Sequence, residues 1–377
     1  MKSELFPWQA KALEEPNDYA LWCAEAGIGK TYAGQLWLQQ GSRSKNPVVL
    51  CPKHIKGKWQ KAAKHVYTPY EVRTKDLPPE PTAVVIDEAD EYAAPLFIAR
   101  SRSKMAENLY NYLREYPDCP VLLLTATPIR SNPWNLHTLL TYIGRYEDWR
   151  DYQKRYFELV SRPYRPRPFW QPVVGWQQSI QKELEANAEI ALMKDMVDYL
   201  PPETHDIITI KPPKYEKNEE WEATKQFVED HRSEQREKYK HIKEIGKGFR
   251  KAVVVAHYRE QIDQLAKELG KERTTYVLDG RSKDVESIIA DAEASSECYF
   301  IIQASVGAGF ELPSFAVMVF ASQGYGVRNY VQIRARIKRI NTLKPVKYYY
   351  LLGGKCDKAI YDSIQAGKDF VPSLYKA

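Results

Sequence analysis

The sequence has few cysteines, no long apolar run and no excess of acidic residues. Its five cysteines are scattered, without the paired spacing of a zinc site or a redox motif, so we expect free thiols in a reducing, cytoplasmic compartment. No run approaches the roughly 18 apolar residues that a membrane-spanning helix needs, and residues 1–4 do not begin a signal peptide. We therefore expect no membrane association. The chain also lacks internal repeats and low-complexity tracts, which excludes a solenoid.

The composition is that of a globular protein. Apolar residues make up 44% of the 377 residues and charged residues 28%, which predicts a soluble chain long enough for two domains with separate cores. The net charge of +6 favours a polyanionic partner without identifying one.

Residues 24–31, with the sequence AEAGIGKT, are a predicted phosphate-binding loop. Its glycines let backbone N–H groups approach phosphate oxygens closely. The lysine can then reach the outer phosphates of a nucleotide, and the threonine hydroxyl can bind Mg²⁺. Alanine stands where a glycine usually opens this pattern, so the loop taken alone could be an ordinary glycine-rich turn. The predicted nucleotide contacts are Ala26, Gly27, Ile28, Gly29, Lys30 and Thr31, with Thr31 also a metal ligand.

Residues 83–90, with the sequence AVVIDEAD, form an apolar run that ends in carboxylates. Continuous valine and isoleucine are typical of a buried parallel strand, whose C-terminal end lies at the ligand-binding edge of an α/β sheet. At that edge Asp87 would bind Mg²⁺, and Glu88 would orient and deprotonate an attacking water. A strand that runs into a solvated acidic turn is the alternative. Together with residues 24–31, this segment predicts an enzyme that hydrolyses ATP.

Strand-length apolar segments alternate with helical patterns in both halves of the chain. In the first half we predict strands at residues 19–23, 48–51, 83–86 and 121–125, and helices at 31–40, 58–65, 104–115 and 134–142. In the second half we predict strands at 252–256, 275–278, 299–304, 317–321 and 347–352, and helices at 260–269, 283–292, 330–338 and 357–366. The alternation predicts two α/β domains, each a mostly parallel sheet flanked by helices. We place them at residues 1–145 and 246–377, with a crossover and helical linker region at 146–245.

The linker region contains a proline-rich, basic and aromatic segment at residues 161–172. Its prolines exclude a central strand or helix there. Arg162, Arg165 and Arg167 could contact a nucleic-acid backbone, or the segment could be a simple surface crossover.

Residues 332–339, with the sequence QIRARIKR, carry the main functional signal of the second half. On a helix, Gln332, Arg336 and Arg339 fall on one face at positions i, i+4 and i+7. Such a row could place the glutamine near the γ-phosphate and two guanidinium groups near the charge that develops in phosphoryl transfer. The alternative is a solvated basic helix, or one that contacts nucleic-acid phosphates, which is the role we expect for Arg334 and Lys338.

Two further segments could contribute to ligand binding. Gln9, about twenty residues before the phosphate-binding loop, has an amide that could recognise the edge of adenine, although an ordinary helix start also fits. Lys53, Lys56 and Lys58 follow a predicted strand and could bind a phosphate backbone, and a solvated charged loop fits nearly as well.

Two further segments are weak indications when taken alone. They become informative only through their order along the chain relative to the other motifs. Thr125 and Thr127 follow a leucine-rich strand, and their hydroxyls could couple an ATP site to a nucleic-acid track. Glu311 follows a glycine-containing segment at residues 307–309, where it could accept a hydrogen bond from a ribose hydroxyl.

Taken in order, these segments resemble the motifs of superfamily 2 helicases and translocases, over nearly the whole chain. The resemblance rests on residues 5–9, 24–31, 51–59, 87–90, 125–128, 251–257, 307–312 and 332–339. Within the superfamily, residues 125–140, 191–202 and 339–364 are most similar to the Snf2/Rad54-like group of double-stranded DNA translocases. The spelling of residues 87–90 could suggest a DEAD-box RNA helicase, but the upstream signature and the histidine-containing final motif of that group are missing. Ala335 replaces a common glycine, and residues 304–311 match only loosely.

The resemblance implies two tandem RecA-like domains that bind ATP and Mg²⁺. Lys30 and Thr31 would bind phosphate and metal, Asp87 would bind Mg²⁺, and Glu88 would be the base. Gln9 would contact adenine, and Gln332, Arg336 and Arg339 would complete the site from the second domain. The implied activity is a DNA-stimulated ATPase that tracks along duplex or branched DNA, as compact phage-like motors do. A strand-separating helicase on DNA or RNA, and a nucleotide-switched DNA-binding subunit, remain alternatives.

Overall fold

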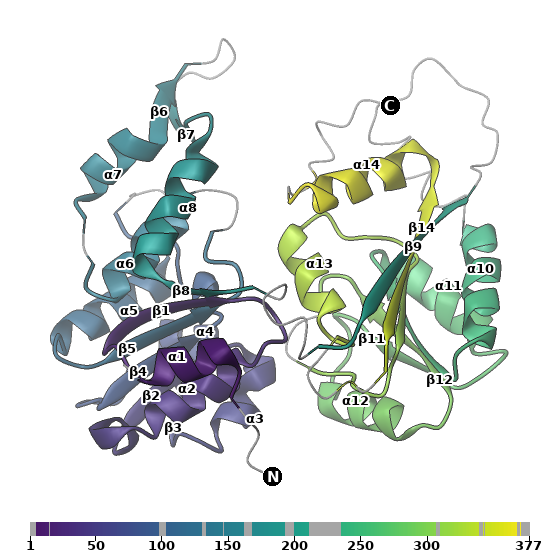
Figure 1. Cartoon of the computed structure of the whole chain (residues 1–377), viewed down its shortest axis with the longest axis horizontal. Coiled ribbons are helices and arrows are strands. Elements are labelled where there is room, and N and C mark those ends of the chain that lie inside the picture. The colour runs from purple at the N-terminus through teal and green to yellow at the C-terminus, as the bar shows by residue number, and fades with distance from the viewer. Residues whose placement is uncertain are drawn as a thin grey trace. The chain divides into compact units, whose positions relative to one another are not determined.

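The computed structural model describes residues 5–14, 16–97, 103–129, 133–145, 147–161, 168–192, 200–210, 235–306, 310–338, 342, 344–367 and 370. The chain divides into two compact units, Met1–Met196 (unit 1) and Val197–Ala377 (unit 2). Each unit contains a six-stranded sheet flanked by helices (Figure 1). This confirms the predicted fold class, two α/β domains built on parallel sheets.

The sheet of unit 1 has the strand order β3-β2-β4-β5-β1-β8, and its pairings are parallel. Its strands are β1 (Tyr19–Ala24), β2 (Pro47–Leu50), β3 (His65–Tyr67), β4 (Ala83–Asp87), β5 (Val121–Thr125) and β8 (Glu189–Ala191). β5 lies between β1 and β4, which carry the two predicted nucleotide motifs. Because the three strands are parallel, the segments that follow their C-terminal ends lie at one edge of the sheet.

Both faces of this sheet are buried, which is why β4 is a continuous apolar run. Val84 and Ile86 belong to one core cluster, whereas Ala83 and Val85 belong to a second cluster on the opposite face. The helices of unit 1 are α1 (Pro7–Glu14), α2 (Lys30–Leu38), α3 (Lys56–Trp59), α4 (Pro69–Thr74), α5 (Lys104–Glu115), α6 (Trp134–Tyr142), α7 (Trp149–Tyr156) and α8 (Trp176–Asn187).

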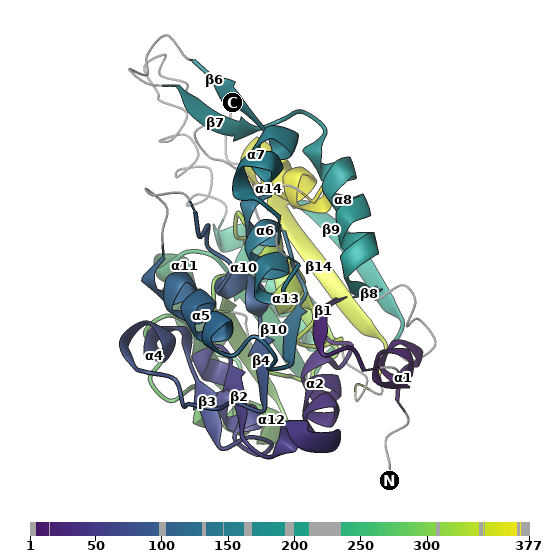
Figure 2. The same ribbon diagram turned by 90° about the vertical axis from the view of Figure 1, so that its left-hand side faces the viewer.

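A two-stranded hairpin, β6 (Phe157–Val160) and β7 (Phe169–Pro172), connects α7 to α8. In both views it lies beyond α7 and α8, at the end of unit 1 away from the six-stranded sheet (Figures 1 and 2). The chain then returns through α8 to β8, which pairs with β1. Residues 147–191 of the predicted linker region thus lie in unit 1, and β7 is not a central strand.

Unit 2 repeats the architecture with the strand order β11-β12-β10-β13-β14-β9, again with parallel pairings. Its strands are β9 (Glu203–Ile210), β10 (Lys251–Ala256), β11 (Thr275–Leu278), β12 (Cys298–Gln303), β13 (Val317–Phe320) and β14 (Val346–Gly353). Its helices are α10 (Gln235–Lys247), α11 (Arg259–Leu269), α12 (Val285–Ala294), α13 (Val327–Arg334) and α14 (Gly354–Gln365).

Two predicted helices differ most from the structure. The helix expected at residues 58–65 is the single turn α3, which ends at Trp59 and is followed by β3. The helix expected at 330–338 is α13, which begins earlier and ends at Arg334. Among the described residues, no helix has the length and hydropathy needed to cross a membrane.

Candidate nucleotide site

The phosphate-binding loop connects β1 to α2 and contains two glycines in the left-handed region. Gly27 has φ 97° and Gly29, which directly precedes α2, has φ 84°. A Cβ atom on Gly29 would lie 2.4 Å from the Nε2 atom of Gln9. Both the backbone conformation and the close approach therefore require glycine at position 29.

Lys30 lies within this loop and is only 8% exposed. Its ammonium group donates to the carbonyl oxygens of Ala24 at 2.6 Å and of Glu25 at 3.1 Å. The positive charge is therefore held at the C-terminal end of β1, beside the start of the loop.

Helix α1 supports the loop through two side chains. The Gln9 amide donates from Nε2 to the Gly29 carbonyl at 3.0 Å and accepts from the Phe6 N–H at 2.9 Å. The Trp8 indole donates to the Ile28 carbonyl at 3.1 Å. Gln9 is thus a buried support of the loop, and its contact with adenine stays a prediction.

Asp87, at the end of β4, accepts hydrogen bonds from side chains of two helices, α2 and α3. Its Oδ2 atom accepts from the Thr31 hydroxyl at 3.0 Å and from the Trp59 indole at 2.9 Å. Burial and the nearby charge of Glu88 raise the pKa of the Asp87 carboxyl to about 6, although Trp59, Lys30 and Thr31 act in the opposite direction. The sequence predicted that Asp87 and Thr31 both bind Mg²⁺. It did not indicate Trp59, because no local sequence pattern links a residue of α3 to the end of β4.

Glu88 follows Asp87 in an unusual backbone conformation, with φ 54° and ψ 49°. Left-handed geometry is uncommon for a residue other than glycine and is found most often at functional sites. The Glu88 N–H donates to Oδ1 of Asp87 at 3.0 Å, which closes the turn between the two carboxylates.

Asp90 connects this turn to the end of β5, a role that the sequence did not reveal. Its carboxylate accepts from the hydroxyls of Thr125 at 2.9 Å and of Thr127 at 3.2 Å. Asp90 is 1% exposed, so these hydrogen bonds satisfy a buried charge. From the sequence we expected Thr125 and Thr127 to couple an ATP site to a nucleic-acid track. In the structure both hydroxyls donate hydrogen bonds to Asp90 in the acidic turn.

The arrangement fits a magnesium-bound nucleotide. The Thr31 hydroxyl and the Asp87 carboxylate are hard oxygen ligands of the kind that Mg²⁺ prefers, and they lie within hydrogen-bonding distance of each other. Gly27 and Gly29 adopt the left-handed backbone conformations that the turn of the loop requires.

The three lysines of the predicted phosphate-backbone segment differ in their surroundings. Lys53 and Lys58 are exposed, whereas Lys56 forms an ion pair with Glu71 at 2.7 Å. Partial burial acts to raise the pKa of Glu71, but hydrogen bonds from Lys56, Thr68 and Lys75 outweigh it and lower this pKa to about 2. Lys56 thus stabilises the start of α4 within unit 1.

In unit 2, Gln332 and Arg336 are almost fully buried, at 4% and 5% exposure. The Arg336 guanidinium donates to the carbonyl oxygens of Gln332 at 2.8 Å and of Phe310 at 2.7 Å. Arg336 lies just beyond the end of α13, so its side chain caps the last turn of the helix instead of extending from it. Glu311 is partly buried next to this contact.

Arg334 and Lys338 are not the solvated or phosphate-facing cations that we expected. Both pair with Glu203 at the start of β9, each at 3.1 Å. Burial acts to raise the pKa of Glu203, but His205, Arg334 and Lys338 lower it to about 2. The predicted site residues Arg162, Arg165, Arg167 and Arg339 lie outside the described residues, as do residues 307–309.

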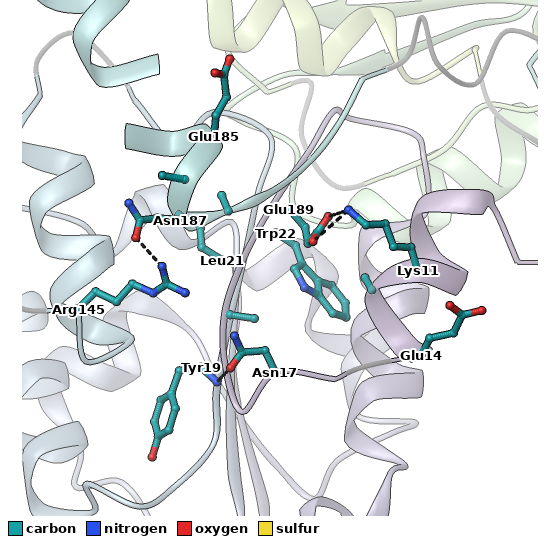
Figure 3. Close-up of a pocket in the computed structure, with 14 residues that line it drawn as sticks. Lys11, Glu14, Asn17, Tyr19, Leu21, Trp22, Arg145, Glu185, Asn187 and Glu189 are labelled. Carbon is teal, nitrogen blue, oxygen red and sulfur yellow. Dashed lines mark hydrogen bonds and ion pairs between the residues drawn. The ribbon is translucent and has the colours of Figure 1, made fainter. Parts of the chain in front are cut away.

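A separate hollow of about 440 Å³ lies beside β1 in unit 1, lined by parts of α1, α8 and β8 (Figure 3). Lys11 and Glu189 form an ion pair across it at 3.0 Å, and Arg145 donates to Asn187. The ion pair connects α1, the helix that carries Gln9, to β8. The residues of the phosphate-binding loop do not line this hollow.

Comparisons by sequence found distant relatives, and no family model matches the chain. The SWI/SNF-related matrix-associated actin-dependent regulator of chromatin subfamily A-like protein 1 of Xenopus tropicalis is 23% identical over 283 residues, which cover 65% of this chain and 29% of that protein. The Xenopus laevis protein of the same name is also 23% identical, with 65% and 28% covered. The chain therefore spans less than a third of the length of these curated relatives.

Comparisons by structure cover nearly the whole chain. The Pyrococcus furiosus Hef helicase domain matches 95% of this chain and 97% of its own, with a TM-score of 0.55 and 12% identity. The Saccharomyces cerevisiae protein Dbp5, bound to RNA and ADP BeF3, matches 97% of this chain and 88% of its own, with a TM-score of 0.57 and 13% identity. At such low identity these matches show the fold alone, which is a tandem RecA-like architecture.

Proposed function

We propose that this chain is an ATP-driven nucleic-acid motor of superfamily 2, which hydrolyses ATP to move along or remodel DNA. The main support is the 3.0 Å hydrogen bond between the Thr31 hydroxyl and the Asp87 carboxylate. It joins the first helical turn after a glycine-rich loop to the acidic end of β4, a parallel strand of the same sheet. P-loop ATPases use these two ligand types, at these two positions, to bind the metal of the metal–nucleotide complex.

Each residue of unit 1 has a distinct proposed role. Lys30 would exchange its two carbonyl partners for phosphate oxygens, since its ammonium group already lies in the loop. Thr31 and Asp87 would hold Mg²⁺, which neutralises phosphate charge when bound. Glu88 would orient the attacking water and accept its proton, and the backbone of residues 26–29 would bind the phosphates. Gln9 would keep the loop in its binding conformation and contact adenine.

Unit 2 would contribute Gln332, Arg336 and Arg339 to turnover and Glu311 to nucleotide binding, as the resemblance implies. This part of the proposal rests on the resemblance of residues 307–312 and 332–339 to the motifs of superfamily 2 helicases and translocases. Because Arg336 also holds the Phe310 carbonyl, its replacement needs a stability measurement beside every activity measurement.

The substrate proposal is duplex or branched DNA. It is supported by the chromatin-regulator relatives and by the likeness of three segments to the double-stranded DNA translocases. Lys53 and Lys58, exposed after β2, and Arg162, Arg165 and Arg167 would bind the phosphate backbone. The neighbour Dbp5 is bound to RNA, so a strand-separating DNA or RNA helicase is the second candidate.

The decisive experiment measures ATP turnover with duplex DNA, single-stranded DNA and RNA at one fixed salt concentration, because backbone binding depends steeply on ionic strength. We expect stimulation by duplex or forked DNA. Lys30→Ala and Glu88→Gln should each abolish turnover but keep DNA binding. The exposed Lys45, outside the loop, provides the matched control Lys45→Ala, which should keep full activity.

Three outcomes would overturn the proposal or part of it. Full turnover in Glu88→Gln would refute the assignment of the base. Stimulation by RNA alone would favour the RNA helicase. Nucleotide binding without turnover on any of the three polymers would favour a DNA-binding subunit that uses the nucleotide as a switch.

A further inference from the structure

Glu203 is the first residue of β9, and its carboxylate binds two cations of the segment that carries Arg336. Its Oε2 atom lies 3.1 Å from the Arg334 guanidinium, and its Oε1 atom lies 3.1 Å from the Lys338 ammonium group. These cations come two residues before and two residues after Arg336 in the sequence. One carboxylate therefore holds this segment on both sides of a residue with a proposed role in turnover.

The carboxylate belongs to a rigid part of unit 2. β9 pairs with β14 at all 8 of its residues. From β14, the Tyr348 hydroxyl donates to the Arg334 carbonyl at 2.9 Å. Two adjacent strands of the sheet thus fix the end of α13, one through a carboxylate and one through a hydroxyl.

The three charged side chains are largely removed from water. Those of Glu203, Arg334 and Lys338 are 25%, 24% and 12% exposed. The Arg334 guanidinium also lies over the rings of Tyr330 and Tyr348, at 5.4 and 5.0 Å from their centroids. Ion pairs between exposed side chains contribute little to stability, whereas removal of one charge from a largely buried group is costly. Without the carboxylate, two poorly solvated cations would repel each other and displace the segment.

Arg336 must leave its present partners to act in turnover. Its guanidinium donates to the carbonyl oxygens of Gln332 and Phe310, and a role at the phosphates requires it to release them. A side chain that changes partners reaches the same point in every cycle only if its backbone stays in place. The two ion pairs of Glu203 provide that fixed backbone.

We propose that Glu203 is a positioning residue for turnover, which holds the backbone of residues 334–338 so that Arg336 reaches the nucleotide. The inference deepens the proposed function, on which it rests, by adding a residue that no motif of the sequence indicates. Glu203 acts through Arg336 alone, without contact to nucleotide or metal. Its loss should therefore lower the rate of turnover and not the affinity for ATP, which the proposed function assigns mainly to unit 1.

The test measures ATP turnover with the nucleic acid that best stimulates the unsubstituted protein. Glu203→Gln keeps the size of the side chain but removes its charge. It should lower kcat by roughly tenfold to a hundredfold, the range for a small displacement of a reacting group, and change KM for ATP by less than about twofold. Glu203→Asp, which keeps the charge, should restore part of kcat. Asp206→Asn, at an exposed carboxylate of the same strand, is the matched control and should keep both kcat and KM.

Hydrogen exchange measures the position of the segment without turnover. The Leu312 N–H donates to the Arg336 carbonyl at 2.9 Å, and the Ala335 N–H donates to the Val331 carbonyl at 3.2 Å. In Glu203→Gln both amides should exchange roughly tenfold to a hundredfold faster, as expected for loss of a hydrogen bond to a charged group. The amides of β10 should exchange as in the unsubstituted protein, which would show that unit 2 has not unfolded.

The outcomes separate this inference from the proposed function. If the unsubstituted protein turns over ATP and Glu203→Gln has the same kcat, the inference is wrong and the proposed function stands. A loss of kcat that Asp206→Asn reproduces, or that accompanies faster exchange throughout β10, would indicate a general loss of stability and would also overturn the inference. If the unsubstituted protein shows no turnover on any polymer, the proposed function fails. Unchanged exchange at Leu312 in Glu203→Gln would then show that Glu203 does not fix the segment either.

Discussion

Replacement of Gly29 by alanine should damage the nucleotide site more than the same change at two other glycines with similar backbones. Gly29 has φ +84°, while Gly41 and Gly144 have φ +56° and +73°. All three substitutions carry the cost of a left-handed alanine, about 1 kcal/mol. At Gly41 and Gly144 the added Cβ meets nothing within 4 Å, whereas at Gly29 it would lie 2.4 Å from Nε2 of Gln9.

The additional cost at Gly29 follows from what Gln9 must give up. Its buried amide would lose the hydrogen bond to the Gly29 carbonyl and the one from the Phe6 N–H. Each contributes about 1 kcal/mol, and a buried polar group left without a partner costs about 1–3 kcal/mol more. We therefore expect Gly29→Ala to lower the free energy of unfolding by roughly 4–6 kcal/mol, against about 1 kcal/mol for Gly41→Ala or Gly144→Ala.

Urea unfolding of the three variants, with binding of a fluorescent ATP analogue, checks this prediction. A double-mutant cycle isolates the contact: in a Gln9→Ala background, Gly29→Ala should cost little more than the two control substitutions. If Gly29→Ala proves no more costly than Gly41→Ala in the parent chain, the contact between α1 and the phosphate-binding loop is not as described, and Gln9 has no supporting role.

Two more predictions concern Asp87 and Glu71. Trp59→Phe removes the indole donor to Asp87, and because hydrogen bonds to charged groups contribute about 1.5–3 kcal/mol, Mg²⁺-dependent nucleotide binding should weaken roughly tenfold or more. Trp37→Phe, which removes an indole bond to a backbone carbonyl in the same core, should leave the Mg²⁺ dependence unchanged in the same titration. Glu71 has a pKa lowered to about 2, so its stabilising effect is present above its ordinary value near 4.5 and is lost as pH falls towards 2. Glu71→Gln should therefore lower stability at pH 7, by up to about 1 kcal/mol, and much less at pH 2.5; a pH-independent difference in urea unfolding would contradict this.

The sequence predicted best those strands that are buried on both faces. β5 begins and ends where the apolar run predicted, because a continuous apolar segment between turns is typical of a strand that is buried on both faces of a parallel sheet. Three edge strands, β3, β8 and β9, were missed, whereas the edge strand β11 was predicted. β9 has one neighbour, β14, and most of its side chains are exposed, so its sequence is too polar to predict a strand.

The end of α13 was wrongly predicted because no local signal marks it. Neither glycine nor proline follows Arg334, and the helical pattern continues to Lys338. The helix ends because Arg336 turns back to the Gln332 carbonyl while it also binds the carbonyl of Phe310. Phe310 is distant in sequence, so the boundary depends on a tertiary contact.

The same reason explains why Trp59, the partner of Asp87, and the role of Asp90 were missed. The sequence predicted Asp87, Thr31 and Lys30 because their residue types follow a recognised pattern. Trp59 and Thr125 reach the acidic turn only because β5 lies between β1 and β4 and α3 covers the same end of the sheet. Strand order is a property of the whole domain, and local periodicity does not determine it.

The acidic turn is fixed at both ends, and this explains the backbone of Glu88. Asp87 is held by Thr31 and Trp59, and Asp90 by Thr125 and Thr127. The chain must reverse direction between two anchored carboxylates, and Glu88 adopts the left-handed conformation that the reversal requires. Such a conformation costs about 1–3 kcal/mol for a residue other than glycine. Four hydrogen bonds to buried carboxylates offset that cost, so the strained backbone is a consequence of the anchors on either side of the proposed base.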